Sequence, residues 1–344
     1  MPAEWEPHAA TWLAWPHNAE DWPGRFDRIP GVFAGIIAEL TRAERVRLIV
    51  PDAAREAEVR ARLAEAGADL GAVDCFHAAT DRSWTRDFVP LFVKRGREIR
   101  AVKFRFDGWA RYDNHGKDDE AGRRVAGFLG MEGLEVSAPR DGAPAPVVLE
   151  GGAIDVDGEG TLLASEDCLV TGPRGRNPWL GVEGTERVLA EHLGVEKVIW
   201  VGDGVAGDDT AGHVDDFVRF AGVGRIVLAE ERDPADPNHR PLAEAAERLA
   251  GVRDARGRAL EIVRLPMPGP VLWGKERLPA SYANYYVASD RVLVPVFDDP
   301  NDGQAIGVLG ELFPGRRIVG VRAVDLVLGL GTIHCSTHEE PARG

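Results

Sequence analysis

A cysteine between two histidines stands out near the C-terminus. Cys335 lies nine residues from the end of the chain, between His334 and His338, and it follows the glycine-rich segment Gly329–Gly331. A thiol reacts as a nucleophile only in its thiolate form, and a flexible turn with basic neighbours is one way to expose and activate it. Most free cysteines instead serve as small hydrophobic residues in a core. Taken alone, this stretch favours the core interpretation.

Acidic residues and a histidine begin other predicted hairpins of the chain. Asp87 begins one hairpin, Glu150 begins a second, and His213 with Asp215 begins a third. Since His213 and Asp215 are two residues apart, both side chains face the same way on a strand. If the hairpins radiate from one axis, these starts meet with Cys335 in one central pocket. Three carboxylates in a single cleft repel one another unless a cation is present.

The cation in such a pocket is either a metal ion or a substrate. One histidine and several carboxylates could hold Zn²⁺ or Mn²⁺, with Cys335 as an added ligand. No pair of these residues has the spacing of a zinc finger or of a His-Glu-x-x-His motif, which counts against a metal. A guanidinium suits carboxylates because its contacts with them are planar and bidentate. A thiolate beside it could attack its carbon, and the bound cation would help to ionise the thiol.

The elements that must position these residues repeat along the chain. Each predicted unit is a β-hairpin around a short polar turn, then a helix, then one more strand. The four copies have hairpins at 87–104, 152–164, 213–229 and 282–297, helices at 121–128, 185–193, 241–250 and 302–313, and last strands at 135–136, 197–201, 261–265 and 317–321. A fifth copy follows if residues 332–337 pair with the strand at 11–15. The repeats predict a ring of modules closed by both termini, and an unrelated α+β sheet is the alternative.

Composition and charge exclude several classes of partner. The chain has 344 residues, 44% hydrophobic and 28% charged, which is ordinary for a globular protein with a sizeable core. Its formal net charge of −15 argues against nucleic acid and anionic membranes as partners. We see no signal peptide and no apolar run long enough to span a bilayer. Three scattered cysteines suit a reducing cytoplasm, and monomer and homo-oligomer both stay open.

Five motifs together resemble one known family. They are Trp84-x-Arg86-Asp87, Leu149-Glu150-Gly151-Gly152, Asp209-Thr210-x-Gly212-His213-x-Asp215, Ala280-Ser281-Tyr282-x-Asn284-x-Tyr286 and Gly329-x-Gly331-x-Ile333-His334-Cys335. In order and spacing the chain is similar, from Met1 to Pro341, to the agmatine deiminases of the porphyromonas-type peptidylarginine deiminase family, within the guanidine-modifying superfamily. The resemblance implies one catalytic domain over residues 1–344. It implies an α/β fold, a five-fold pseudosymmetric α/β propeller of ββαβ modules, closed by the N- and C-terminal segments.

The resemblance also implies a reaction, the hydrolysis of a guanidine to a urea with release of ammonia. Agmatine would give N-carbamoylputrescine, in polyamine (putrescine) synthesis or in arginine-derived catabolism. By family analogy, Cys335 attacks the guanidinium carbon and forms a covalent amidino-thioether. His213 protonates the departing ammonia and then activates water, which suits a side chain whose pKa lies near neutrality. Glu150 assists His213 and contacts the guanidinium.

Four further residues are implied to bind the substrate. Asp87 and Asp215 clamp the guanidinium nitrogens and hold the carbon at the thiolate. Trp84 could stack on the alkyl chain or ammonium of the substrate, with core packing as the alternative. Asp209, from the motif that contains His213, is a further candidate. Because the carboxylates supply the electrostatics, no metal or organic cofactor is implied, and the partner is a small cationic guanidine.

The chain departs from the family pattern around the expected pocket. Phe88 and Val89 replace threonine and glycine, Ala211 replaces asparagine, and Leu330 and Thr332 interrupt the glycine turn. These changes leave the predicted catalytic and binding side chains in place. They surround the expected pocket, so they affect which substrate tail it accepts. The alternatives are therefore the same chemistry on arginine or on a substituted or peptidyl arginine, and a non-catalytic guanidine or polyamine binding protein.

Other reactive side chains are predicted to have structural roles. Cys75 and Cys168 lie in apolar contexts, which favours core packing. His334 precedes Cys335, so on a strand it points to the opposite face and away from the substrate. His338 is predicted to lie in a solvated tail. The proline-rich segment 139–146 is the predicted flexible stretch.

Overall fold

Five small sheets share one pattern of strand connection in the computed structural model, which describes residues 1–343. In each sheet, an antiparallel strand pair is followed by a helix and by a strand that joins in parallel. One sheet has the order β20-β1-β2-β3, with β20 His338–Pro341, β1 His8–Ala14, β2 Arg45–Val50 and β3 Val73–His77. The chain therefore has a mixed α/β fold.

The other four sheets have three strands each. They are β4-β5-β6 (Leu91–Arg95, Glu98–Lys103, Gly133–Glu135), β9-β10-β11 (Ile154–Val156, Thr161–Ser165, Lys197–Val201), β12-β13-β14 (Val218–Gly222, Arg225–Glu230, Glu261–Pro266) and β17-β18-β19 (Tyr286–Val287, Arg291–Val296, Arg317–Arg322). The predicted hairpins, helices and last strands are confirmed at the level of elements.

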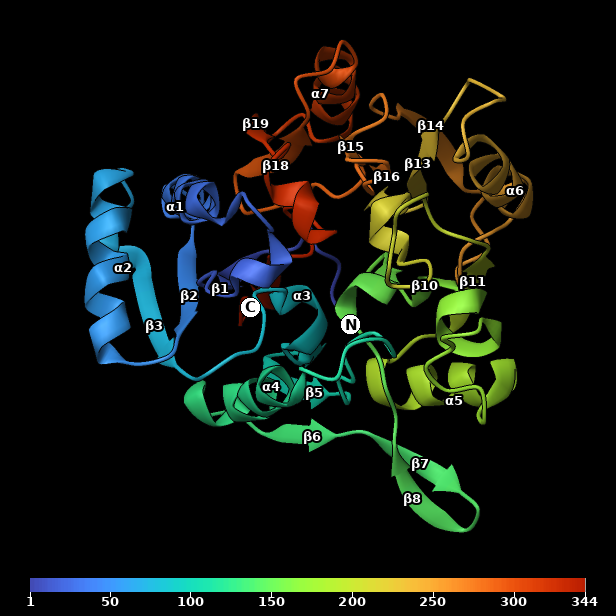
Figure 1. Cartoon of the computed structure of the whole chain (residues 1–344). Coiled ribbons are helices and arrows are strands. Elements are labelled where there is room, and N and C mark those ends of the chain that lie inside the picture. Colours follow the sequence, from blue (N-terminus) through green and yellow to red (C-terminus); the bar gives the residue numbers. More distant parts are fainter. Residues whose placement is uncertain (344) are drawn as a thin grey trace.

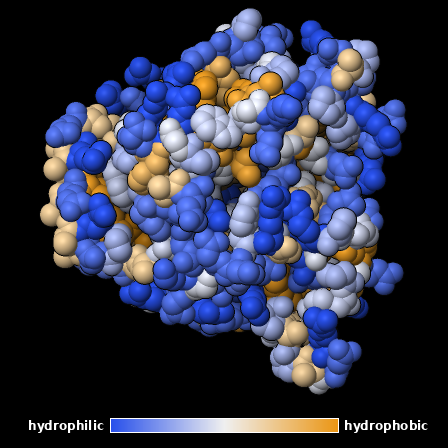
Figure 2. Space-filling view, in the orientation of Figure 1, coloured by the Kyte–Doolittle hydropathy of each residue, from blue (hydrophilic) through white to orange (hydrophobic). Residues whose placement is uncertain are grey.

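The helices of eleven to thirteen residues lie at the periphery of the molecule, and both marked ends of the chain lie near its middle (Figure 1). They are α1 Ile29–Leu40, α2 Ala53–Glu65, α4 Gly116–Phe128, α5 Gly181–Leu193, α6 His239–Leu249 and α7 Asp302–Leu312. Hydrophilic side chains cover most of the face in Figure 2, and hydrophobic ones gather above a small hollow near its centre. No helix within residues 1–343 is long and apolar enough to cross a membrane.

Local sequence explains where these elements begin and end. Helix α2 starts after Asp52, whose side chain accepts a hydrogen bond from the backbone N of Arg55 at 2.9 Å. It ends at Glu65, and Gly67 two residues later adopts a left-handed φ of +81°. The middle strands β10 and β18 are apolar and almost wholly buried, as expected for strands covered on both faces.

The first and last parts of the chain share one sheet, as predicted. The C-terminal strand in that sheet lies later in the sequence than the predicted residues 332–337. Strand β1 pairs antiparallel with β20, Trp12 opposite His338. Residues 332–337 form turns and no strand. The hydroxyls of Ser336 and Thr337 donate to backbone carbonyls three to four residues earlier, which stabilises turns over an extended strand.

The polar starts of the hairpins are also turns where strands were predicted. Asp87 lies in the one-turn helix α3, Thr85–Phe88, and Asp215 lies in the short 3₁₀ turn Val214–Asp216. Strand alternation therefore does not explain why His213 and Asp215 are neighbours. The proline-rich segment is not an irregular loop, since β7 Ser137–Arg140 and β8 Ala143–Pro146 form a hairpin; a second small hairpin consists of β15 Leu272–Trp273 and β16 Glu276–Arg277.

Candidate active site

Cys335 lies on a tight turn after β19 and is 8% exposed. Leu330 adopts a left-handed φ of +66°, and a Cβ added at Gly331 would lie 3.0 Å from the Cβ of Cys335. The amide Nδ2 of Asn284 donates to the Sγ of Cys335 at 3.0 Å, and the thiol lies 3.6 Å from Oδ2 of Asp215. The turn thus holds the thiol beside polar side chains, although Cys335 also belongs to the main hydrophobic cluster.

The thiol of Cys335 is held in its protonated form. Burial raises its pKa well above the usual value, and the carboxylates of Asp215, Asp216 and Asp87 raise it further. A positive charge brought next to the sulfur would reverse this effect. The geometry therefore provides a nucleophile that a cationic ligand can activate.

His213 lies at the centre of the predicted acidic residues. Its Nδ1 is 3.9 Å from Oδ1 of Asp87 and 4.0 Å from Oδ1 of Asp215, and its Nε2 is 3.8 Å from Oε2 of Glu150. A Cβ added at Gly152 would lie 2.6 Å from Nδ1, so this close approach requires glycine. Burial acts to lower the pKa of His213, but the surrounding groups, first among them Asp87, raise it well above the usual value. The ring is therefore a proton donor at neutral pH.

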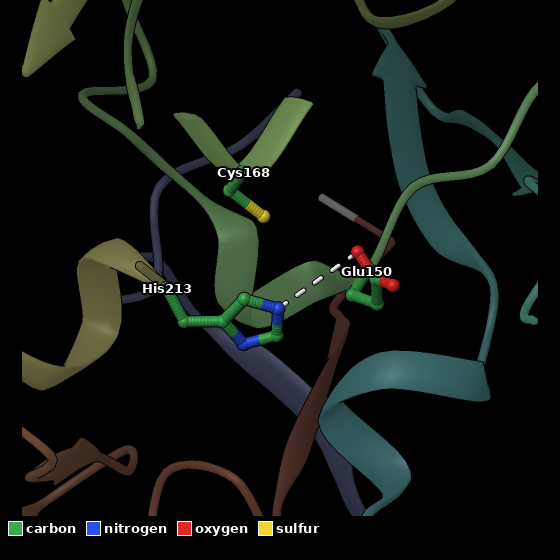
Figure 3. Close-up of side chains that lie close together, drawn as sticks. All are labelled: Glu150, Cys168 and His213. Atoms are coloured by element: carbon green, nitrogen blue, oxygen red, sulfur yellow. Dashed lines mark ion pairs between the residues drawn. The ribbon is translucent and has the colours of Figure 1, made fainter. Parts of the chain in front are cut away.

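Glu150 forms a buried ion pair that the sequence analysis missed. The Nε of Arg176 donates to its Oε1 at 2.7 Å, and both side chains are fully buried. Burial acts to raise the pKa of Glu150, but Arg176 and His213 outweigh it and lower the pKa to about 2. Glu150 therefore stays ionised beside the imidazole of His213, which Figure 3 shows together with Cys168.

Asp87 and Asp215 are both buried, yet their protonation differs. The indole Nε1 of Trp109 donates to Oδ2 of Asp87 at 2.9 Å, and burial raises the pKa of Asp87 to about 6. Oδ2 of Asp215 contacts Nδ1 of His334 at 2.7 Å. Burial acts to raise the pKa of Asp215, but this contact outweighs it and lowers the pKa. Asp215 is thus the more firmly ionised of the two.

A pocket joins five of the seven predicted site residues. Its lining includes Trp84, Asp87, Asp209, His213 and Cys335, together with Asp216 and Tyr112. Glu150 and Asp215 are absent from this lining and lie directly behind it, within 4.0 Å of His213. Oδ2 of Asp209 accepts a hydrogen bond from the hydroxyl of Tyr112 at 2.5 Å. The pocket can accept a planar cation beside a thiol, with carboxylates on several sides.

Two groups of side chains within residues 1–343 have atoms close enough to hold a metal ion. One consists of Glu150, Cys168 and His213, and the other of Asp215, Asp216 and Cys335. In each group the possible ligand atoms lie within 4.8 Å of one another. Cys168 is fully buried in a hydrophobic cluster, as core packing predicts, but its thiol also lies near the polar groups of Glu150 and His213. Its apolar sequence context gave no sign of them.

Asn284 and His334 are polar partners whose roles the sequence analysis did not predict. Asn284 belongs to one of the five motifs, and its Nδ2 also donates to Oδ1 of Asp216 at 3.0 Å. His334 does not line the pocket, as predicted, but it connects Asp215 to Glu4, with its Nε2 2.7 Å from Oε2 of Glu4. The motif around Asn284 was the available signal, whereas nothing local to Glu4 pointed to the site.

His338 is not in a solvated tail, so that prediction was wrong. It lies in β20, it is 1% exposed, and its ring packs edge-on against Phe92. Burial lowers the pKa of His338 to about 4. The side chain is therefore a neutral core residue at physiological pH.

Comparison with known proteins places the chain among deiminases. Residues 1–341 match the model of the Porphyromonas-type peptidyl-arginine deiminase family. The agmatine deiminase of Ectopseudomonas mendocina (strain ymp) is 36% identical over 367 residues, an alignment that covers 99% of this chain and 95% of that protein.

Solved structures of related proteins superpose on nearly the whole chain. The agmatine deiminase of Enterococcus faecalis catalysing its reaction superposes with a TM-score of 0.89 at 29% identity, covering 100% of this chain and 96% of the other. A C. jejuni agmatine deiminase variant with substrate bound superposes with a TM-score of 0.86 at 26% identity, covering 99% and 95%. The chain belongs to the Porphyromonas-type peptidyl-arginine deiminase family.

Proposed function

We propose that the chain is a guanidine hydrolase that converts agmatine and water into N-carbamoylputrescine and ammonia, with Cys335 as the nucleophile. The observation that carries the proposal is the buried thiol of Cys335, which lies in one pocket with His213 and Asp87. The similar proteins described as agmatine deiminases support the same substrate. For this reaction we propose a role in polyamine (putrescine) synthesis or in arginine-derived catabolism.

The proposed first step forms the covalent intermediate. The guanidinium enters between Asp87 and Asp215, and Oδ1 of Asp215, a buried atom without a hydrogen-bond partner within residues 1–343, accepts from one of its nitrogens. The positive charge lowers the pKa of the Cys335 thiol, which loses its proton to solvent, and the thiolate attacks the guanidinium carbon. One terminal C–N bond breaks, and His213 donates the proton with which this nitrogen leaves as ammonia.

The proposed second step returns the enzyme to its starting state. His213, now neutral, takes a proton from water, whose oxygen attacks the carbon of the amidino-thioether. The C–S bond breaks, the proton left on that oxygen goes to solvent to give the ureido product, and the freed thiolate takes a proton from solvent to become the resting thiol. Glu150 stabilises the imidazolium in both steps through its contact at 3.8 Å. Because His213 regains from water the proton that it lost, the proposed cycle uses no cofactor.

The pocket favours agmatine over free arginine. Arginine carries, at the end away from its guanidinium, a carboxylate that agmatine lacks, and acidic residues of the lining such as Asp209 would repel this group. Arg82 is the one arginine or lysine in that lining within residues 1–343, and its guanidinium is already paired with Asp21. A carboxylate is therefore left without a free cationic partner and faces like charges.

We expect ammonia release from agmatine to exceed that from arginine by roughly 100-fold in kcat/KM, since unpaired charges discriminate strongly between substrates. The measurement is steady-state ammonia release from agmatine, arginine, methylated arginine and an arginine-containing peptide. Equal or faster release from arginine would remove the agmatine assignment and leave the guanidine chemistry in place. No release from any guanidine would favour a binding protein.

The raised pKa of Cys335 predicts how its alkylation depends on pH. A thiol with a raised pKa has little thiolate at neutral pH, and the thiolate fraction grows about tenfold per pH unit until the pKa is reached. Inactivation by iodoacetamide should therefore accelerate steadily from pH 7 past the usual thiol pKa of about 8.5. Peptide mass spectrometry should locate the modification on Cys335. A rate that is constant above pH 7 would mean that the free protein already holds a thiolate.

We also infer that the five ββαβ modules form a five-fold pseudosymmetric propeller closed by the N- and C-terminal segments. The shared connection pattern of the five sheets and the β1–β20 pairing support this arrangement. We treat residues 1–344 as one catalytic domain. The three free cysteines support a cytoplasmic location, where thiols stay reduced.

A further inference from the structure

We propose that Glu150, Cys168 and His213 form a binding site for a thiophilic divalent metal ion such as Zn²⁺, and that an ion bound there inhibits the enzyme. The inhibitory part rests on the function proposed above, because it depends on His213 as the proton carrier. The binding part depends only on the three side chains and can be tested without any turnover.

The three ligand atoms already converge on one point. The thiol of Cys168 projects from the turn Asp167–Thr171 toward the space between His213 and Glu150 (Figure 3). The ligand atoms lie within 4.8 Å of one another, and Nε2 of His213 is 3.8 Å from Oε2 of Glu150. Ligand atoms around tetrahedral Zn²⁺ lie about 3.5 Å apart, given Zn–N and Zn–S bonds of about 2.0 and 2.3 Å. Small side-chain rotations would bring the three ligand atoms to the separation that bound Zn²⁺ requires.

Two of these atoms are buried without a hydrogen bond among the described residues, and they face each other as an ion pair at 3.8 Å. Oε2 of Glu150 and Nε2 of His213 have no hydrogen bond within residues 1–343, although both residues are at least 99% buried. An unpaired buried polar atom is costly, and a ligand that satisfies both atoms at once is favoured by that cost. The other oxygen of Glu150 stays on Arg176, which orients the carboxylate for an ion.

The donor set selects the class of metal. One thiolate, one imidazole and one carboxylate suit Zn²⁺ and its relatives better than Mg²⁺ or Ca²⁺, which prefer oxygen ligands alone. Three protein ligands leave one position open for water. The second candidate group is less suited, because Sγ of Cys335 and Oδ1 of Asp216 both already accept hydrogen bonds from Nδ2 of Asn284.

An ion at this site would stop the proposed reaction at His213. The ion would replace the proton on Nε2 of the imidazolium, so the ring would keep at most the proton on Nδ1 and would no longer be an imidazolium. It can then neither donate the proton that ammonia needs nor regain one from water. The metal would also take the place of the imidazolium as the partner of Glu150.

The binding test makes Cys168 the single thiol of the chain. The chain has three cysteines, so Cys75→Ser combined with Cys335→Ser leaves only Cys168. We expect this variant to bind one Co²⁺, used as the spectroscopic substitute for Zn²⁺, with the near-ultraviolet absorption of a thiolate–cobalt bond. Adding Cys168→Ser should abolish that absorption. Failure of the first variant to show it, or its persistence in the second, overturns the site.

The activity test uses proteins that keep Cys335. Zn²⁺ should inhibit ammonia release by the unmodified protein, and a chelator should restore it. Cys168→Ser should keep its activity without metal and need at least roughly tenfold more Zn²⁺ for half inhibition, since a direct ligand is lost. Equal sensitivity of the two proteins would overturn inhibition through this site. If the unmodified protein releases no ammonia from any guanidine, the proposed function fails while the cobalt result still decides the site.

Discussion

Replacing Cys335 with serine should lower kcat for ammonia release from agmatine by about 10⁴-fold or more, the scale seen when a catalytic nucleophile is removed. Serine keeps the shape of the side chain and the hydrogen bond from Nδ2 of Asn284. It does not supply an anion, because the nearby carboxylates that raise the pKa of the thiol would oppose an alkoxide even more strongly. The loss should therefore fall on the chemical step.

A second cysteine provides the matched control for this change. Cys75 is half-buried in β3, outside the pocket lining, and Cys75→Ser should keep the activity within a few-fold. Agmatine should still raise the melting temperature of the Cys335→Ser protein, since the carboxylates that hold the guanidinium remain. Turnover within tenfold of the unmodified protein would contradict Cys335 as the nucleophile. Loss of both turnover and agmatine binding would point instead to damage to the pocket.

The repeated elements could be predicted because each follows from its own sequence. Strand β11 lies at the predicted residues, and α2 begins directly after its N-cap, Asp52. The inner ends of the hairpins could not be predicted in the same way. Asp87 and Asp215 lie on single turns, which other parts of the chain hold in place, as the backbone N of Gly152 does when it donates to Oδ1 of Asp87 at 3.1 Å. Such contacts leave no local pattern.

The chemical groups of the site were predictable, but their supporting residues were not. Cys335 and His213 are recognisable because few residue types can act as nucleophile or proton carrier. No local sequence pattern indicates that Arg176 is buried against Glu150. Cys168 has the sequence context of a core residue and is buried as one, yet it faces the site. Contacts between buried side chains that are far apart in the sequence can be identified only from the three-dimensional structure.

The Arg176–Glu150 pair makes the largest predicted contribution to stability near the site. Arg176→Met should lower the free energy of unfolding at pH 7 by about 3–5 kcal/mol, because it leaves a buried carboxylate without its cation. The guanidinium also donates to the carbonyl oxygens of Arg174 and Thr210, at 2.7 and 2.6 Å. Urea unfolding of the two proteins measures the difference. Activity should fall as well, since Glu150 would no longer hold its orientation beside His213.

An exposed ion pair supplies the control for this substitution. Arg256 forms two hydrogen bonds with Glu196 at 2.9 and 2.8 Å, but both side chains are about half exposed. Arg256→Met should therefore cost about 0–1 kcal/mol, because water screens the pair and solvates the remaining carboxylate. If both substitutions cost the same, Glu150 is not held by a buried ion pair, and the proposed orientation of His213 loses its support.

The pH dependence separates loss of the ion pair from loss of packing. Arg176 holds the pKa of Glu150 at about 2, below the value of about 4.3 in an unfolded chain, so its contribution is complete above pH 4.3 and lost as the pH falls toward 2. Without Arg176, burial raises the pKa of Glu150, and the carboxyl takes up a proton at a higher pH. The deficit of Arg176→Met should therefore be smaller at pH 5 than at pH 7. A packing defect alone would give the same deficit at both.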